Sequence, residues 1–302
     1  MKTYLECIPC FLNQALKAMN LIKEDDNVKE KVLKKIMKKL ANIDLNKKPS
    51  EFSRLVYNII EETTGNDDPH KEIKKRDNEH AISLLPKVKK VIEKSEDKLL
   101  TTIKIAIAGN IMDFAANSDY NLKKTIEEVL ESDFAISDYE KFKEDIKKAS
   151  SIVYLADNAG EIVFDKLLIE KIRKLNNCKI YFFVKGKPIV NDATERDVTF
   201  VGIDKFDNIE IRKINTEFPN MGVKKVLESK IPNRLKSSIS KESEEFINFL
   251  RKIDLIISKG QGNYESLSEV DTNIYFLLIA KCPVVARDLN VEKGKIILKY
   301  NK

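Results

Sequence analysis

Apolar residues recur every three or four positions through most of the first half of the chain. In NVKEKVLKKIMKKLANI, residues 27–43, this stripe consists of Val28, Val32, Leu33, Ile36, Leu40 and Ile43. Such spacing is typical of an amphipathic helix that buries one face. The same spacing predicts helices over residues 10–21, 27–41, 51–62, 68–94, 98–117, 122–131 and 138–149.

The pattern changes near residue 150, where short, unbroken apolar runs rich in β-branched and aromatic residues begin. Such runs predict buried strands. They occupy residues 151–156, 179–184, 209–214, 253–258 and 274–280, with shorter edge pieces expected at 284–286 and 295–300. An amphipathic segment that predicts a helix separates the first two runs. Buried strands that alternate with such helices indicate a mostly parallel sheet with crossover helices in the second half of the chain. We therefore expect an α/β protein with a helical domain over residues 1–149 and an α/β domain over residues 150–302.

Composition and charge narrow the function classes. The chain has 302 residues, and its 54 Lys and Arg nearly balance its 48 Asp and Glu. The two signs are interleaved on helical faces, unlike the basic patch of a nucleic-acid-binding protein. No apolar run reaches the ~20 residues that span a bilayer, and the N-terminal segment lacks the order of a signal peptide. We expect a cytoplasmic protein that binds neither nucleic acid nor membrane, and the net charge of +6 suits a small phosphorylated or acidic substrate.

Polar clusters follow four of the predicted strands. Asp157 and Asn158 follow the first strand, and Asn191 and Asp192 follow the second. The segment KGQGNYE, residues 259–265, follows the fourth strand, and Lys281 follows the fifth. In an open parallel sheet these ends meet at one edge, where ligands bind. If the first two strands are neighbours, their backbones are ~4.8 Å apart, and Asp157 and Asp192 share one pocket.

Carboxylate and amide oxygens in one pocket indicate a metal site. Such hard ligands suit Mg²⁺ or Mn²⁺, and without a cation two close carboxylates repel each other. Each cluster also has a plainer interpretation. Asp157 and Asn158 are good helix caps, and Asn191 and Asp192 are typical turn residues. The GQG segment is either an ordinary loop or a nest of backbone N–H groups for an anion.

Cys7 and Cys10 form a Cys-x-x-Cys pair near the N-terminus. Only His70, His80, Cys178 and Cys282 are available to complete a zinc site, and no second Cys-x-x-Cys exists. No predicted strand precedes the pair, as a thioredoxin-like redox site requires. The pair is interpreted as buried thiols at a helix start, with a second metal site or a redox pair as alternatives. Phosphate-binding and dinucleotide-binding glycine motifs are absent from the sequence.

Several segments together resemble a known family. DNAGEIVFD, KGKPIVNDAT, SKGQGNYE and AKCPVVA, in this order, are similar to motifs of the damage-control phosphatases, also called domain of unknown function 89. CIPC, DPHKEIKKRDN and AGNIMDF are similar to the microbial branch that carries the Cys-x-x-Cys pair. The resemblance spans nearly the whole chain. It implies a helical N-terminal region, a Rossmann-like α/β domain, and divalent-metal-dependent phosphatase activity on metabolites such as sugar phosphates or phosphopantetheine-type compounds. A carboxyl methyltransferase activity has been attributed to one eukaryotic branch.

The resemblance also implies roles for individual residues. Asp157, Asn158 and Asp192 match the family's metal ligands, and Lys281 matches its phosphate-contacting lysine. The remaining matches to the pocket are Glu161, Asn191, Lys259, Gly260, Gln261, Gly262 and Asn263, with Asn110 and Asp113 reaching the same cleft from the helical region. FLLIAK stands where other branches carry an arginine–threonine signature, so their substrates are not carried over. The family's glycine-bearing stretch is not evident in residues 215–245.

The function expected from these residues is phosphomonoester hydrolysis of a small phosphorylated metabolite. Asp157, Asp192 and Lys281 are the expected catalytic residues, and the cofactor is one divalent cation, Mg²⁺, Mn²⁺, Co²⁺ or Ni²⁺. The nucleophile is either water, which we favour, or Asp157, although Ala159 stands where aspartyl-phosphate enzymes carry a second acid. The alternatives are an S-adenosylmethionine-dependent carboxyl methyltransferase and a non-catalytic metal- or metabolite-binding module. The oligomeric state is not specified by the sequence.

Overall fold

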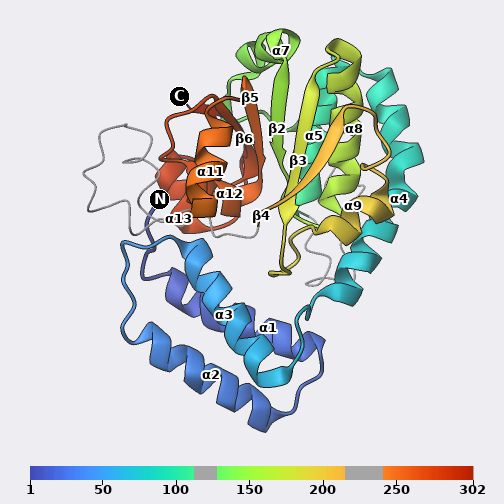
Figure 1. Cartoon of the computed structure of the whole chain (residues 1–302). Helices are drawn as coiled ribbons and strands as arrows, with labels where there is room; N and C mark the ends of the chain where they lie inside the picture. The colour runs from blue at the N-terminus through green and yellow to red at the C-terminus, as the bar shows by residue number, and fades with distance from the viewer. Residues whose placement is uncertain (112–127, 215–240, 302) are drawn as a thin grey trace.

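A seven-stranded sheet with strand order β1-β7-β6-β5-β2-β3-β4 forms the centre of the molecule (Figure 1). The computed structural model describes residues 1–111, 128–214 and 241–301. Its strands are β1 (Ile136–Ser137), β2 (Ser151–Leu155), β3 (Lys179–Lys185), β4 (Ile209–Ile214), β5 (Leu255–Lys259), β6 (Ile274–Ile279) and β7 (Ile296–Asn301). All neighbouring strands are parallel except β6 and β7, which are antiparallel. The predicted α/β fold with a mostly parallel sheet is confirmed.

The strand order reverses at β2. The chain passes from β2 to β3 on one side and later returns as β5 on the other, and both neighbours run parallel to β2. The loops that follow β2 and β5 therefore lead to opposite faces of the sheet, which opens a crevice suited to a ligand at the carboxyl ends of these strands. Asp157 lies two residues beyond the end of β2, within this crevice.

Helices cover both faces of the sheet because successive side chains of a buried strand point to opposite sides. Ile152 and Tyr154 of β2 belong to the core beneath one helical layer, whereas Val153 and Leu155 belong to the other core. The first layer contains α4 (Lys71–Lys94), α5 (Lys98–Ala108), α7 (Tyr139–Lys148), α8 (Glu161–Leu175) and α9 (Glu195–Val201). The second layer contains α11 (Lys241–Leu250), α12 (Gly260–Leu267) and α13 (Pro283–Leu289).

The first three helices, α1 (Cys7–Leu21), α2 (Asp26–Leu40) and α3 (Pro49–Thr64), form a separate unit that we call the cap. Figure 1 shows the cap beyond one end of the strands. Its own apolar core includes Val32, Ile36 and Leu40, so the stripe predicted for α2 is confirmed. Ile189, from the loop after β3, packs into the same core. The cap therefore contacts the loops at the carboxyl edge of the sheet.

Two local differences from the sequence predictions have simple causes. The prediction of an edge strand at residues 284–286 is wrong, because these residues lie within α13. Pro283 in the first turn and a hydrogen bond from Val285 N to the Cys282 sulfur both favour the start of a helix there. β1 was not predicted because a two-residue strand is too short to show a pattern. The predicted helical residues 112–117 and 122–127 lie outside the described residues.

The predicted domain boundary near residue 150 stays a prediction. Elements that precede it contribute to the layers around the sheet, because α5 packs on α8 and β1 pairs with β7. Within the described part of the chain, no helix is both long and apolar enough to cross a bilayer.

Candidate functional site

The loops after β2 and β3 are joined to each other by backbone contacts. Asn158 and Asp192 form an isolated antiparallel bridge. Ala193 N donates to the Asp157 carbonyl oxygen at 2.7 Å, and Ala159 N donates to the Asn191 carbonyl oxygen at 2.9 Å. These contacts bring the two polar clusters together, as the sequence predicted for neighbouring strands.

A cavity of about 300 Å³ lies at this edge of the sheet and extends to the cap. Several of the sequence-predicted residues line it, namely Asn110, Asp157, Asn158, Asn191, Asp192, Gln261, Gly262 and Lys281. The cap contributes Gln14, Ser50, Ser53 and Arg54, and the loops and α12 contribute Lys185, Ile189, Val190, Glu265 and Ser266. The cavity is therefore walled by the sheet edge on one side and by the cap on the other.

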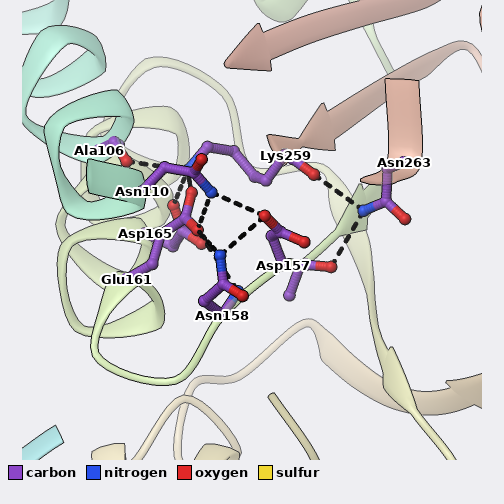
Figure 2. A network of polar contacts seen from close by, with 9 residues as sticks. Ala106, Asn110, Asp157, Asn158, Glu161, Asp165, Lys259 and Asn263 are labelled. Carbon is purple, nitrogen blue, oxygen red and sulfur yellow. Dashed lines mark hydrogen bonds and ion pairs between the residues drawn. The ribbon is translucent and has the colours of Figure 1, made fainter. Parts of the chain in front are cut away.

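The Asp157 carboxylate is oriented by two amides (Figure 2). Asn110 Nδ2 and Asn158 Nδ2 donate to Asp157 Oδ2 at 2.7 and 2.8 Å. Asn110 also donates to Glu161 Oε2 at 2.6 Å, so its amide bridges the two acids. Asn110 lies on the short 3₁₀ helix η1 (Gly109–Ile111), which directly follows α5. The predicted approach of this segment to the cleft agrees with its position, whereas Asp113 lies outside the described residues.

A buried ionic network supports Asp157 from behind (Figure 2). Lys259 Nζ contacts Glu161 Oε1, Asp165 Oδ1 at 2.7 Å and the Ala106 carbonyl oxygen at 2.9 Å. The side chains of Lys259, Glu161 and Asp165 are all 0% exposed, so none of them lines the cavity. Burial opposes the charge of Lys259, but Asp165 and Glu161 raise the pKa of its ammonium group. The structure thus gives Lys259 and Glu161 a supporting position rather than the expected place in the pocket lining.

The start of α12 packs directly against Asp157. Gly260 has a φ of +78°, and a Cβ built on it would lie 1.8 Å from Asp157 Oδ2, so only glycine fits there. Asn263 Nδ2 donates to the carbonyl oxygens of Ala156 and Lys259 at 3.1 and 2.9 Å, which ties α12 to the end of β2. Gly260 and Asn263 therefore also lie behind the cavity wall.

Lys281 and Gln261 face the cavity from the second helical layer. Gln261 Oε1 accepts a hydrogen bond from Lys281 N at 3.1 Å, which holds the two residues side by side. Both residues line the cavity, and Lys281 is exposed.

Electrostatics at the sheet edge favour a bound cation. Burial raises the pKa of Asp157 to about 8, with further contributions from the charges of Glu161 and Asp192. Burial also raises the pKa of Asp192, although Lys185 opposes the shift with its Nζ 3.6 Å from Asp192 Oδ2. Two carboxylates and an amide oxygen are a donor set that suits a hard divalent cation, and such a cation relieves their repulsion. The residues present therefore fit a metal ion.

Cys7 and Cys10 lie in the first turn of α1. Cys7 is half-buried and packs at the edge of the same apolar cluster as Cys282, whereas Cys10 is exposed. Burial raises the pKa of the half-buried Cys7 thiol, which favours the less reactive protonated form. Across residues 1–111, 128–214 and 241–301, no three His, Cys, Asp or Glu side chains are arranged to hold a metal. The role of the pair stays a prediction.

Sequence reasoning missed the residues that the cap and the β3 end bring to the cavity. Lys185 is the first residue of the quoted segment KGKPIVNDAT, so its position after a strand was an available signal. Arg54 lies on the amphipathic helix α3, where a basic residue is ordinary, and no sequence signal distinguishes it. Gln14, Ser50 and Ser53 are equally unmarked.

Comparisons with known proteins identify the family of this chain. A family model described as the damage-control phosphatase ARMT1-like domain matches residues 3–297. The chain is 35% identical over 305 residues to damage-control phosphatase PH1575 of Pyrococcus horikoshii, covering 100% of this chain and 99% of that protein. It is 30% identical over 301 residues to a damage-control phosphatase of Archaeoglobus fulgidus, covering 97% of each. The crystal structure of a DUF89 family protein from P. horikoshii is 33% identical, with a TM-score of 0.80 and coverage of 100% of both chains. The chain therefore belongs to the damage-control phosphatase ARMT1-like family.

Proposed function

We propose that this protein hydrolyses phosphomonoesters of small metabolites and that the reaction depends on one divalent cation. The observation that carries the proposal is the pairing of the loops after β2 and β3, which brings Asp157 and Asp192 into one cavity. The names of the relatives from P. horikoshii and A. fulgidus, both damage-control phosphatases, support the same reaction for this chain.

Asp157, Asn158 and Asp192 are the residues that would hold the cation. When bound, a divalent ion offsets the negative charge of the phosphoryl group and of its transition state. Mg²⁺, Mn²⁺, Co²⁺ and Ni²⁺ are all candidates, since the donor set is compatible with each. Asn110 keeps Asp157 in one orientation through its 2.7 Å hydrogen bond.

The remaining phosphate oxygens are bound by cationic groups of the cavity. Lys281 is exposed at the cavity wall, and Lys185 lies within 3.6 Å of Asp192 Oδ2. A water molecule oriented by a carboxylate attacks phosphorus in line with the leaving oxygen. It passes one proton through that carboxylate to solvent as its oxygen bonds to phosphorus. The bond from phosphorus to the ester oxygen breaks, and the leaving alcohol takes a proton from solvent. Water is favoured over Asp157 as the nucleophile because Ala159 stands where aspartyl-phosphate enzymes carry a second acid.

A phosphate-release screen tests the proposal directly. Phosphorylated metabolites and p-nitrophenyl phosphate are incubated with metal-free protein to which Mg²⁺, Mn²⁺, Co²⁺ or Ni²⁺ is added in turn. We expect release with at least one cation and none in the presence of EDTA. Asp192→Asn should lower kcat by more than the roughly 100-fold that loss of an outer-shell partner costs, with circular dichroism and thermal unfolding close to the wild type.

The matched control is Asp207→Asn, because Asp207 is exposed and does not line the cavity. It should leave kcat unchanged. Turnover by Asp192→Asn at saturating metal would remove Asp192 from the mechanism, and full activity in EDTA would remove the metal.

A further inference from the structure

The wall of the cavity that belongs to the cap carries its own set of polar groups. Gln14 lies on α1, and Ser50, Ser53 and Arg54 lie on α3. Ser53 Oγ donates to Gln14 Oε1 at 3.2 Å, and Ser50 Oγ lies 3.1 Å from Ser266 Oγ on α12. These groups face the cavity from a different element than the proposed metal ligands, so they meet a different part of any bound molecule.

Arg54 is half-buried and lacks a carboxylate partner within the described part of the chain. Its hydrogen bond there joins Nη1 to the Pro188 carbonyl oxygen at 3.5 Å, which is long for such a bond. By contrast, Arg212 and Arg287 each form an ion pair with a glutamate, at 2.7 and 3.1 Å. With respect to the described residues, the guanidinium of Arg54 therefore keeps donors that can bind an anion in a bidentate manner.

Arg54 belongs to a different wall of the cavity from the groups proposed to bind the phosphate being cleaved. In the proposed function, the phosphate being cleaved is bound at the sheet edge by Lys185, Lys281 and the cation. Arg54 approaches the cavity from the cap. Arg54 lines the cavity, and its positive charge is close enough to Asp192 to oppose the rise that burial causes in the pKa of that carboxyl group. A substrate held between α3 and the carboxyl ends of the strands would meet positive charge from both walls.

We propose that Arg54 determines substrate specificity by binding a second anionic group, a carboxylate or a further phosphate, of a hydroxylated phosphomonoester. Ser50, Ser53 and Gln14 bind the hydroxyl groups between the two anions. The volume of about 300 Å³ lies at the low end for small-molecule sites, which limits the substrate to a compact polar metabolite. This inference rests on the proposed phosphatase function.

Matched substrate pairs test the inference. Glycerol 3-phosphate and 3-phosphoglycerate differ by a carboxylate, and fructose 6-phosphate and fructose 1,6-bisphosphate differ by a phosphate. We expect the wild type to have the higher kcat/KM for the doubly anionic member of at least one pair, and the pair that responds identifies the anion. Arg54→Met should reduce that ratio of kcat/KM by about 10- to 100-fold, as loss of a charge-assisted hydrogen bond does. Arg54→Lys should keep part of the preference, because it retains the charge without the planar fork.

Arg251→Met is the matched control, since Arg251 is exposed and precedes β5, at the opposite edge of the sheet. It should leave the ratio unchanged. A wild type without preference in either pair, or a loss by Arg54→Met that is equal for both members, overturns the inference while leaving the phosphatase activity intact. If no substrate is turned over, the proposed function fails separately. In that case, the affinities of Mn²⁺-loaded protein for glycerol 3-phosphate and 3-phosphoglycerate are measured by calorimetric titration. The inference about Arg54 is overturned if Arg54→Met lowers both affinities equally or lowers neither.

Discussion

At the scale of single residues, the site depends on how tightly Asp157 is surrounded. Asn110 and Asn158 donate to one of its oxygens, and Gly260 leaves room for that same oxygen. Behind these residues, the fully enclosed Lys259 forms ion pairs with the buried acids Glu161 and Asp165 and offsets part of their negative charge. An uncompensated buried charge is strongly unfavourable, so the lysine allows a cluster of acids to exist at the end of β2. Most of these residues lie in contact with the site without lining the cavity.

Gly260→Ala should destabilise the fold and disable the site together. The positive φ costs an alanine roughly 1–2 kcal/mol, and the added Cβ must displace the Asp157 carboxylate. We expect a lower free energy of unfolding in urea and phosphate release near background. Gly262→Ala is the control, because Gly262 lies in the same helix with nothing within 4 Å of the new Cβ, and a helical alanine is more stable by about 0.5–1 kcal/mol. Equal stability changes for both variants would contradict this explanation.

At the scale of elements, α4 joins the loops that carry the proposed metal ligands. Asn78 on α4 is 1% exposed. Its Oδ1 accepts a hydrogen bond from Gly160 N at 2.7 Å, and its Nδ2 donates to Asp197 Oδ1 at 2.9 Å. Gly160 belongs to the loop after β2, and Asp197 lies in the first turn of α9, just after the loop that carries Asp192. One side chain of the helical half therefore connects both loops.

Asn78→Ala should weaken metal binding through the loops without removing a ligand. Supporting partners of metal ligands typically change affinity by 10- to 100-fold, so we expect the Kd for Mn²⁺ to rise by about tenfold in calorimetry. Asn177→Ala is the control, since Asn177 is exposed and precedes β3 at the far edge of the sheet. An unchanged Kd in Asn78→Ala, despite a lower free energy of unfolding, would mean that Asn78 only stabilises the fold.

At the scale of the whole molecule, the cavity exists because the cap closes over the sheet edge. Lys48 Nζ donates to the Ser266 carbonyl oxygen, and α3 packs on α12. Glu265 lies next to this contact and lines the cavity, with Gln261 Nε2 donating to its Oε1 at 2.9 Å. Burial raises the pKa of Glu265 to about 7, although the Gln261 hydrogen bond opposes the shift. The interface between the cap and α12 thus contains a carboxyl group, that of Glu265, for which burial favours the neutral form.

The stability of the metal-free protein should fall with rising pH because of Glu265. Its pKa is about 7 in the folded state against an ordinary 4.5, so between these values the folded state binds more protons than the unfolded chain. The stabilising effect of the neutral group is complete below the lower value and is lost as the pH rises through the higher one. Glu265→Gln should therefore gain free energy of unfolding relative to the wild type, by about 1–3 kcal/mol between about pH 5 and about pH 8. Urea unfolding in EDTA, carried out at several pH values, measures this difference in the free energy of unfolding.

Glu140→Gln is the control for this pH dependence, since Glu140 is exposed on α7. The free energy of unfolding of Glu140→Gln should differ from that of the wild type by the same amount at every pH in this range. If the free energies of unfolding of Glu265→Gln and the wild type differed by the same amount at every pH, burial would not govern the protonation of Glu265.

Local patterns predicted most of the fold and half of the site. The α2 stripe and the apolar runs of β2, β3, β4 and β6 are periodic features that depend only on neighbouring residues. Polar residues directly after strands mark the carboxyl edge of a sheet, so Asp157 and Asp192 were recognisable before the strand order was known. Lys259 was predicted to line the pocket because the sequence shows its position at the end of a strand. The direction of its side chain is set by Glu161 and Asp165, which lie in another element, α8.

The sequence by itself determined the elements, the mostly parallel sheet and the acids at its edge, because these follow from side-chain periodicity and from where polar residues interrupt apolar runs. Only the tertiary structure decided that β2 lies between β3 and β5, that Asn78 connects two loops, and that Arg54 of the cap faces the proposed metal ligands. These are contacts between segments far apart in the chain. They depend on how the layers pack, and a helix such as α3 carries the same local pattern whichever surface its polar side faces.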